Sequence, residues 1–165
     1  MSIPGFVIFN FMIYAIINAF TPGPGNFLAL NTVTNYGLKR GKPLFFGIFA
    51  GYYFVQTSCC VFVYALGSLL PQFLAMMKYI GAAYILWLAI HIAISKPGKA
   101  GDEKSASFWK GFALQLVNVK IYLFGITALT GFISDYSRAV PVLCLFEMII
   151  ATVGTVATAT WIGLG

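Results

Sequence analysis

The first 38 residues carry no charged side chain, and this apolar run limits the fold more than any other feature of the sequence. A single helix of that length would extend about 57 Å, nearly twice the roughly 30 Å thickness of the hydrocarbon core of a membrane. The helix must therefore be interrupted. An interruption is present in the middle of the run, where AFTPGPGNFLAL, residues 19–30, contains two prolines and two glycines.

The break is predicted to lie within TPGPGN, residues 21–26. Pro22 and Pro24 lack an amide hydrogen, which strands the carbonyl groups of Asn18 and Phe20. Stranded carbonyls form the negative end of one helix, and the amides that follow form the positive start of the next. Facing helix ends of opposite sign suit a zwitterion, with its ammonium group at the first end and its carboxylate at the second.

The composition is that of a membrane protein, with 60% hydrophobic and 8% charged residues. Further apolar stretches follow the first, and together they predict an all-α, polytopic membrane helix bundle with five spans. The first span is expected to be retained, because no basic region or cleavage motif marks it as a signal peptide. The predicted spans are residues 3–20, 44–66, 72–94, 111–133 and 139–162, with unwound backbone over 21–25 and a shorter helix over 26–38.

The net charge of +6 is unevenly distributed. Seven basic residues fall in segments 39–42 and 96–110, whereas only Lys78 and Arg138 lie toward the other ends of the spans. Basic residues collect in the cytoplasmic loops of membrane proteins. The distribution predicts that both segments are cytoplasmic loops and that the N-terminus lies outside, and it argues against binding to nucleic acid.

The loop 96–110 is also predicted to divide the chain. Residues 1–95 would form a first half with three spans, and residues 111–165 a second half with two. The chain ends where the fifth span should leave the membrane, with no basic flank after it. Such an end is typical of a fragment.

Polar side chains within the spans are candidates for function, because no water satisfies them there. Lys120 lies near the middle of the fourth span, where a charge costs roughly 2.5 to 3.5 kcal/mol, and it should face the bundle interior. Gln115 and Asn118 share a helix face. Local unwinding at Val119 would direct Asn118 and Lys120 into one cavity. The alternative for Lys120 is a side chain that extends to the membrane surface, which its depth makes difficult.

Glu147 and His91 are the candidates for proton coupling. Glu147 lies in the fifth span, and a structural ion pair with Lys78 explains it equally well. His91 lies near the cytoplasmic end of the third span, where a hydrated histidine needs no special role. Glu147 is therefore the preferred candidate.

Two sets of small side chains are interpreted as packing residues. Small-xxx-small spacing, which lets helices approach closely, is found at Gly37, Gly41, Gly47 and Gly51. The cysteines lie in apolar segments, where packing is expected rather than a disulfide or a metal site; they are Cys59, Cys60 and Cys144. No group of side chains has the make-up of a catalytic site, so neither an enzyme nor a cofactor is expected.

Four motifs follow one another along the chain. They are TPGPGN at 21–26, GLKRGKPLFFGIFAG at 37–51, GAAYILWLA at 81–89 and FWKGFALQLVNVKIYLFGITAL at 108–129. In the order and separation of these motifs, the chain resembles the LysE/RhtB family of amino-acid exporters over nearly its whole length. The stretches FALQLVNVK and ALNTVTNYG are most similar to the branch that exports cysteine and O-acetylserine. Many members have Asn-Pro-Lys where this chain has Asn118, Val119 and Lys120.

The resemblance implies an inner-membrane transporter that exports small amino acids, coupled to the proton gradient. It also implies six spans in two halves of inverted topology, of which this chain would lack the sixth. The expected partners are a small amino acid and the lipid bilayer, and a homo-oligomer is left open. Export of homoserine, threonine or another neutral amino acid is one alternative. A non-transporting scaffold subunit is another, although a scaffold has no use for polar residues at mid-depth.

The predicted substrate site combines the two interruptions. Its residues at the first are Thr21, Pro22, Gly23, Pro24, Gly25 and Asn26, and those at the second are Gln115, Asn118 and Lys120. Lys120 is expected to assist the substrate carboxylate, with the two amide side chains as hydrogen-bond partners. The two halves would rock about this site.

Overall fold

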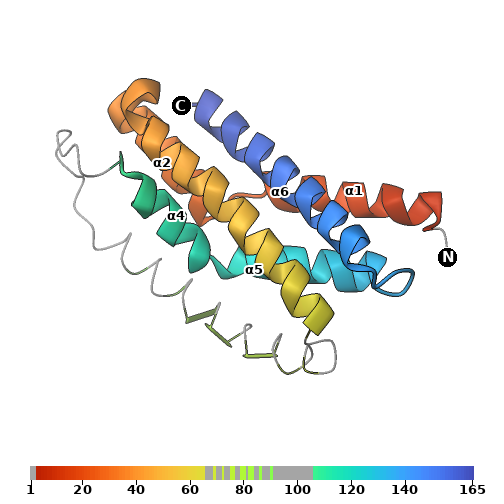
Figure 1. The fold of residues 1–165 in the computed structure, drawn as a ribbon. Helices are drawn as coiled ribbons and strands as arrows, with labels where there is room; N and C mark the ends of the chain where they lie inside the picture. The colour runs from red at the N-terminus through yellow and green to blue at the C-terminus, as the bar shows by residue number, and fades with distance from the viewer. Residues whose placement is uncertain are drawn as a thin grey trace.

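The computed structural model describes residues 3–65 and 106–165 and, between them, residues 69, 72, 75, 76, 79, 80, 82, 83, 86 and 90. The elements are α1 (Gly5–Phe20), α2 (Pro24–Ala65), α4 (Phe108–Leu116), α5 (Val119–Ala128), the π-helical turn η2 (Leu129–Ile133) and α6 (Val140–Gly163). All regular secondary structure among the described residues is thus helical, as predicted (Figure 1). Lys78, His91 and most of the predicted third span lie outside the described residues.

The helices have the length and composition of membrane spans. Within the described residues, α2 and α6 are each long and apolar enough to cross a membrane. The pair formed by α4 and the helix 119–133 passes the same test as one span bent by 54°, and α1 is a shorter apolar helix of 16 residues. This confirms a polytopic membrane helix bundle. The number of five spans and the inverted halves stay predictions.

The first helix is broken where the sequence predicts. Helix α1 ends at Phe20 and α2 begins at Pro24, with non-helical backbone between them. The second helix begins two residues earlier than expected, because proline is well accommodated at the first helical position, where no amide hydrogen is needed.

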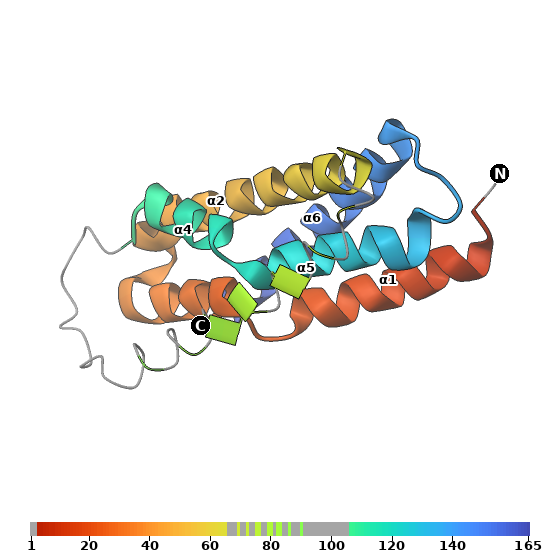
Figure 2. The same ribbon diagram turned by 90° about the horizontal axis from the view of Figure 1, so that it is seen from below.

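The segment 39–42 is not a loop, which corrects the sequence interpretation. Its basic residues are helical, and the chain turns at Gly37 instead, with φ 74° and ψ 165°. A positive φ is accessible to glycine without strain. The turn divides α2 into a first arm, residues 24–36, and a second arm, residues 38–65, which form the hairpin at the left of Figure 2.

Helix α1 and the first arm together run alongside α6. The rings of Phe11 and Phe146 lie 4.9 Å apart, and those of Phe27 and Trp161 lie 6.2 Å apart. The sequence separation is nearly the same in both pairs, although one lies before the break and the other after it. The broken helix therefore acts as one span parallel to α6.

The second arm runs antiparallel to α6 and parallel to α4. Tyr53 Oη lies 3.0 Å from Thr152 Oγ1, and the ring of Tyr52 packs on Gly154, where an added Cβ would lie 2.5 Å from it. Gly47 packs on the backbone of Phe108 at the start of α4. These relative directions agree with the predicted topology, in which the second and fourth spans run in one direction and the fifth span in the other. Which end of the bundle is cytoplasmic stays a prediction.

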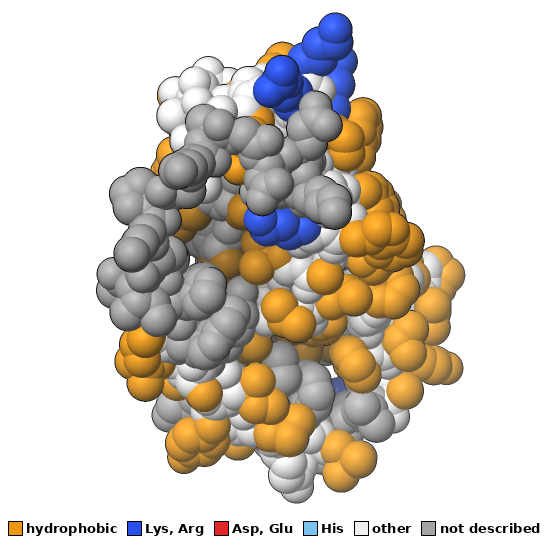
Figure 3. Space-filling model, turned by 90° about the vertical axis from the view of Figure 1, so that its left-hand side faces the viewer, with side chains coloured by type: hydrophobic (Ala, Val, Ile, Leu, Met, Phe, Trp, Pro, Cys, Tyr) orange, Lys and Arg blue, Asp and Glu red, His pale blue; other side chains and the backbone are white. Residues whose placement is uncertain are grey.

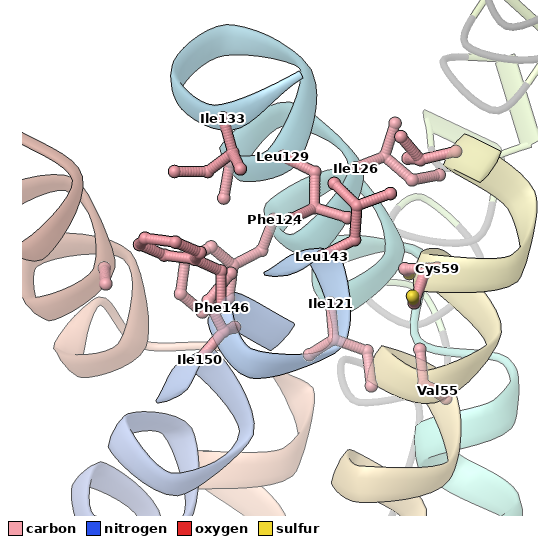
Figure 4. Close-up of a cluster of buried hydrophobic side chains, with 14 of the residues drawn as sticks. Val55, Cys59, Ile121, Phe124, Ile126, Leu129, Ile133, Leu143, Phe146 and Ile150 are labelled. Atoms are coloured by element: carbon pink, nitrogen blue, oxygen red, sulfur yellow. The ribbon is translucent and has the colours of Figure 1, made fainter. Parts of the chain in front are cut away.

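The main core lies where α1, α2, α5, η2 and α6 meet. Figure 4 shows its side chains converging from these helices, and the ten that it labels are Val55, Cys59, Ile121, Phe124, Ile126, Leu129, Ile133, Leu143, Phe146 and Ile150. A smaller core packs the first arm, the start of the second arm and the end of α6. The two cores lie on either side of the broken segments.

The surface is largely apolar, as contact with lipid requires. Among the large exposed side chains are Phe9, 65% exposed, Phe46, 62% exposed, and Trp109, 72% exposed. In Figure 3 most of the visible Lys and Arg atoms lie in the upper half of the face, while hydrophobic side chains cover much of its right-hand and lower parts. Because Gly47 contacts Phe108, the exposed bases of residues 39–42 and Lys110 lie at the same end of the bundle.

Candidate functional site

The two interruptions of the helices face each other. A Cβ added at Gly23 would lie 3.0 Å from Lys120 Cδ, and one added at Gly25 would lie 3.2 Å from both amide atoms of Gln115. Side chains of α4 and α5 thus lie directly on the TPGPGN segment, which is why this segment carries glycine at both positions. The structure brings together the two parts of the site that the sequence analysis combined.

Lys120 binds the carbonyl end of α1. Its Nζ donates a hydrogen bond of 2.6 Å to the Thr21 carbonyl, and its side chain is half-buried. A cation beside the last carbonyls of a helix is stabilised by the helix dipole. The Thr21 hydroxyl is not free for a ligand, because it donates to the Ile17 carbonyl at 2.6 Å. Lys120 thus occupies the position that the sequence analysis assigned to a substrate ammonium group.

Asn26 connects three helices at the same level. Its Nδ2 donates to the Ala19 carbonyl at 3.2 Å, and its Oδ1 accepts a hydrogen bond of 2.8 Å from Thr158 Oγ1. Both side chains are buried. Asn26 therefore satisfies one of the carbonyls that the break exposes and ties α1 and α2 to α6.

Gln115 and Asn118 form a second buried polar pair. Asn118 Nδ2 donates to Gln115 Oε1 at 3.0 Å, and the two residues are 3% and 0% exposed, respectively. Gln115 Nε2 and Asn118 Oδ1 have no partner among the residues that the structure describes. Unpaired polar atoms are costly in a buried setting. The pair therefore leaves one donor and one acceptor unpaired at the break of the fourth span.

The fourth span is broken without a proline. Non-helical backbone lies at Val117 and Asn118, two residues before Lys120, whereas the sequence analysis placed the unwinding at Val119. The Asn118 amide bonds to the Gln115 carbonyl and its side chain to the Gln115 side chain. Asparagine side chains compete in this way with regular helical bonding. The position of Asn118, rather than a proline, accounts for the break.

Two helix N-termini thus lie in the site, those of α2 and α5. At the first, the Phe27 amide bonds to the Gly23 carbonyl at 2.9 Å, whereas the amides of Gly25 and Asn26 have no acceptor within the described parts of the chain. Free amides at the positive end of a helix attract a carboxylate. At the second, Asn118 occupies the N-cap position, and its side chain caps no amide there.

Thr158 is a site residue that sequence reasoning missed. Most other threonines in the helices bond to the carbonyl four residues earlier; they are Thr34, Thr57, Thr130, Thr152 and Thr160. Thr158 donates across to another helix instead. No sequence signal distinguishes it, because its partner depends on how α6 lies against α2.

A separate polar cluster surrounds Gly125. Gln56 on α2 and Glu147 on α6 are both 0% exposed, and their side-chain oxygen and nitrogen atoms lack partners among the described residues. A Cβ added at Gly125 would overlap Gln56 Oε1 and lie 3.0 Å from Glu147 Oε2. The two side chains therefore meet over this glycine. Sequence reasoning found Glu147 and missed Gln56.

The four glycines that were predicted to pack helices together have different surroundings. Gly47 and Gly51 lie against α4, where an added Cβ at Gly51 would approach Gln115 Cβ to 2.7 Å. Gly41 makes room for the ring of Phe45 on its own helix. Gly37 has no neighbour within 4 Å and serves as the turn. The described residues contain no group of three or more His, Cys, Asp or Glu side chains that could hold a metal ion.

Comparison with known proteins identifies close relatives. The family model described as LysE type translocator matches residues 16–163. A cysteine/O-acetylserine efflux protein of Klebsiella pneumoniae is 39% identical over 152 residues, which are 92% of this chain and 78% of that protein. A protein of the same description from Escherichia coli K12 is 37% identical over the same shares. No solved structure matches the chain significantly.

Proposed function

Because the chain belongs to the LysE type translocator family, we propose that it exports cysteine, O-acetylserine or a related small amino acid. Family membership makes it an amino-acid efflux transporter of the bacterial inner membrane rather than an enzyme. The observation that carries the choice of site is the bond from Lys120 Nζ to the Thr21 carbonyl, which joins the two broken helices.

The site offers groups for both ends of a zwitterion. The free amides of Gly25 and Asn26 and the Lys120 ammonium suit a carboxylate, and the Thr21 carbonyl suits an ammonium group. Gln115 Nε2 and Asn118 Oδ1 are left to bond the substrate side chain. A small amino acid with a polar side chain uses all of these groups.

Substrate binding proceeds by an exchange of partners. Lys120 bonds to the Thr21 carbonyl and so fastens α5 to the end of α1. The substrate ammonium replaces Lys120 there, and the substrate carboxylate pairs with the released lysine. The link between the two broken helices then runs through the substrate. The two halves therefore change their relative position only when the site holds substrate or when Lys120 is bonded again to the Thr21 carbonyl.

The first test compares the substrates directly. Cells that express the protein should release more cysteine and O-acetylserine into the medium than cells with an empty vector, because the site carries a donor and an acceptor for a polar side chain. Homoserine and threonine are measured in parallel. Greater release of these two would assign the protein to the other substrate class, and background release of all four would contradict the function.

In the proposed mechanism, the Gln56–Glu147 cluster couples transport to the proton gradient. Glu147 is buried without a counter-ion among the described residues, and Gln56 can donate to it or accept from it. A carboxyl group in such a position can bind and release one proton per transport cycle.

Replacing Glu147 with Gln should uncouple transport from the proton gradient, because an amide keeps the shape of the side chain and binds no proton. Transport in vesicles should fall severalfold in the wild type when an uncoupler collapses the gradient, and should not respond in Glu147→Gln. Asp135→Asn, which changes an exposed acid in the connection before α6, is the matched control. A response of Glu147→Gln equal to that of the wild type would remove Glu147 from the coupling step.

A further inference from the structure

Two cysteines that are far apart in sequence meet between α2 and α6. Cys60 Sγ and Cys144 Sγ lie 3.1 Å apart, although they are separated by 84 positions. Cys59 faces another direction, with its Sγ 3.8 Å from the Tyr122 carbonyl. The sequence analysis treated all three as packing residues. The structure separates them into a facing pair and a single thiol.

The contact between the two thiols is held by the packing around it. Tyr53 and Thr152 join the same two helices by a hydrogen bond, and Tyr52 is seated on Gly154. These contacts fix the antiparallel register that brings Cys60 to Cys144. A disulfide has an S–S distance of about 2.05 Å, so a closure of about 1 Å would suffice.

The pair lies toward one end of the bundle. Cys144 is the fifth residue of α6, half-buried and close to the connection that precedes the helix, and Cys60 lies near the end of α2. The basic residues 39–42 lie at the opposite end of the second arm. In the predicted orientation the cysteine pair is therefore near the outer surface, where the compartment is oxidising and disulfides persist.

We propose that Cys60 and Cys144 form a reversible disulfide that fastens α2 to α6 and stops the transport cycle. Both S–H bonds break and one S–S bond forms. The two electrons and two protons pass to a low-molecular-weight disulfide, which is reduced to two thiols, and an excess of thiol reverses the reaction.

The expected effect on transport rests on the export function proposed above, whereas formation of the disulfide does not. Helix α2 belongs to the first predicted half and α6 to the second, and these halves must move against each other. Gln56 and Glu147 lie one helical turn from the two cysteines on the same helices. A covalent bond there would hold the coupling cluster in one arrangement.

Thiol counting on the purified protein tests the disulfide. Diamide accepts two electrons and two protons, and the thiols that remain are then labelled with a maleimide in denaturant and counted by intact mass. Of the three cysteines, the wild type and Cys59→Ser should each lose two to oxidation, and Cys60→Ser and Cys144→Ser should lose none. Equal labelling of the wild type with and without diamide would overturn the proposal.

Transport by the same preparations tests the arrest. O-acetylserine is the substrate, because it has no thiol to reduce the bond. In proteoliposomes, diamide should lower transport at least tenfold in the wild type and in Cys59→Ser, leave Cys60→Ser unchanged, and be reversed by dithiothreitol. Full transport by the cross-linked protein would overturn the arrest. Absence of transport by the reduced protein would instead contradict the proposed function, and the thiol count would still decide whether the bond forms.

Discussion

Replacing Lys120 with Met should abolish export while leaving the protein in the membrane. Methionine is about as long as lysine but carries no charge, so it can neither hold the Thr21 carbonyl nor pair with a substrate carboxylate. Export of cysteine and O-acetylserine is expected to fall at least tenfold, which corresponds to about 1.4 kcal/mol or more. The measurement is the rate of release into the medium, normalised to the amount of protein in the membrane fraction.

The control for this variant is Lys39→Met, which removes an exposed lysine at the start of the second arm. It changes the net charge by the same amount and should export normally. The unfolding midpoint of the purified Lys120→Met protein is measured as well, because the bond to Thr21 also joins two helices. Export by Lys120→Met at the wild-type rate would remove Lys120 from the substrate site.

Replacing Gly47 with Ala should markedly destabilise the bundle. The added methyl group would overlap the Phe108 carbonyl oxygen and lie 3.0 Å from the Phe112 amide nitrogen, and both are backbone atoms that cannot rotate away. Overpacking of this kind typically costs about 1 to 3 kcal/mol, which exceeds the roughly 1 kcal/mol that alanine gains over glycine in a helix. The midpoint of thermal unfolding in detergent should fall by several degrees.

Gly163→Ala is the matched control for Gly47→Ala. It lies in the last turn of α6, and a Cβ there would meet no atom within 4 Å. Its unfolding midpoint should stay the same or rise slightly, because only the gain in helix propensity remains. An equal midpoint for the two variants would show that α2 and α4 do not pack as closely as the structure describes.

The break in the first helix was predictable because its cause is local. Pro22 and Pro24 lack amide hydrogens wherever the chain goes, so the interruption between α1 and α2 follows from covalent structure alone. The all-helical membrane fold was predictable for a similar reason, since a membrane excludes unpaired backbone groups. The family was recognisable because its motifs are continuous stretches of sequence.

The turn before the second arm shows where the charge pattern led to a wrong prediction of secondary structure. Clustered bases suggested a loop at residues 39–42, yet lysine and arginine are good helix formers and continue the helix. The chain turns at Gly37, whose spacing to Gly41 was equally consistent with helix packing. A glycine that packs and a glycine that turns the chain look alike in a sequence.

By itself, the sequence determined that this chain is a membrane helix bundle and that its first helix is broken at TPGPGN, and it predicted that Lys120 and Asn118 lie in the membrane. Only the tertiary structure decided which groups meet. The contacts from Lys120 to Thr21, from Thr158 to Asn26 and from Cys60 to Cys144 join residues 99, 132 and 84 positions apart. Such pairs depend on the register between helices. That register is set by close packing at glycines such as Gly47 and Gly154, and a shift of one residue would turn these side chains away from one another.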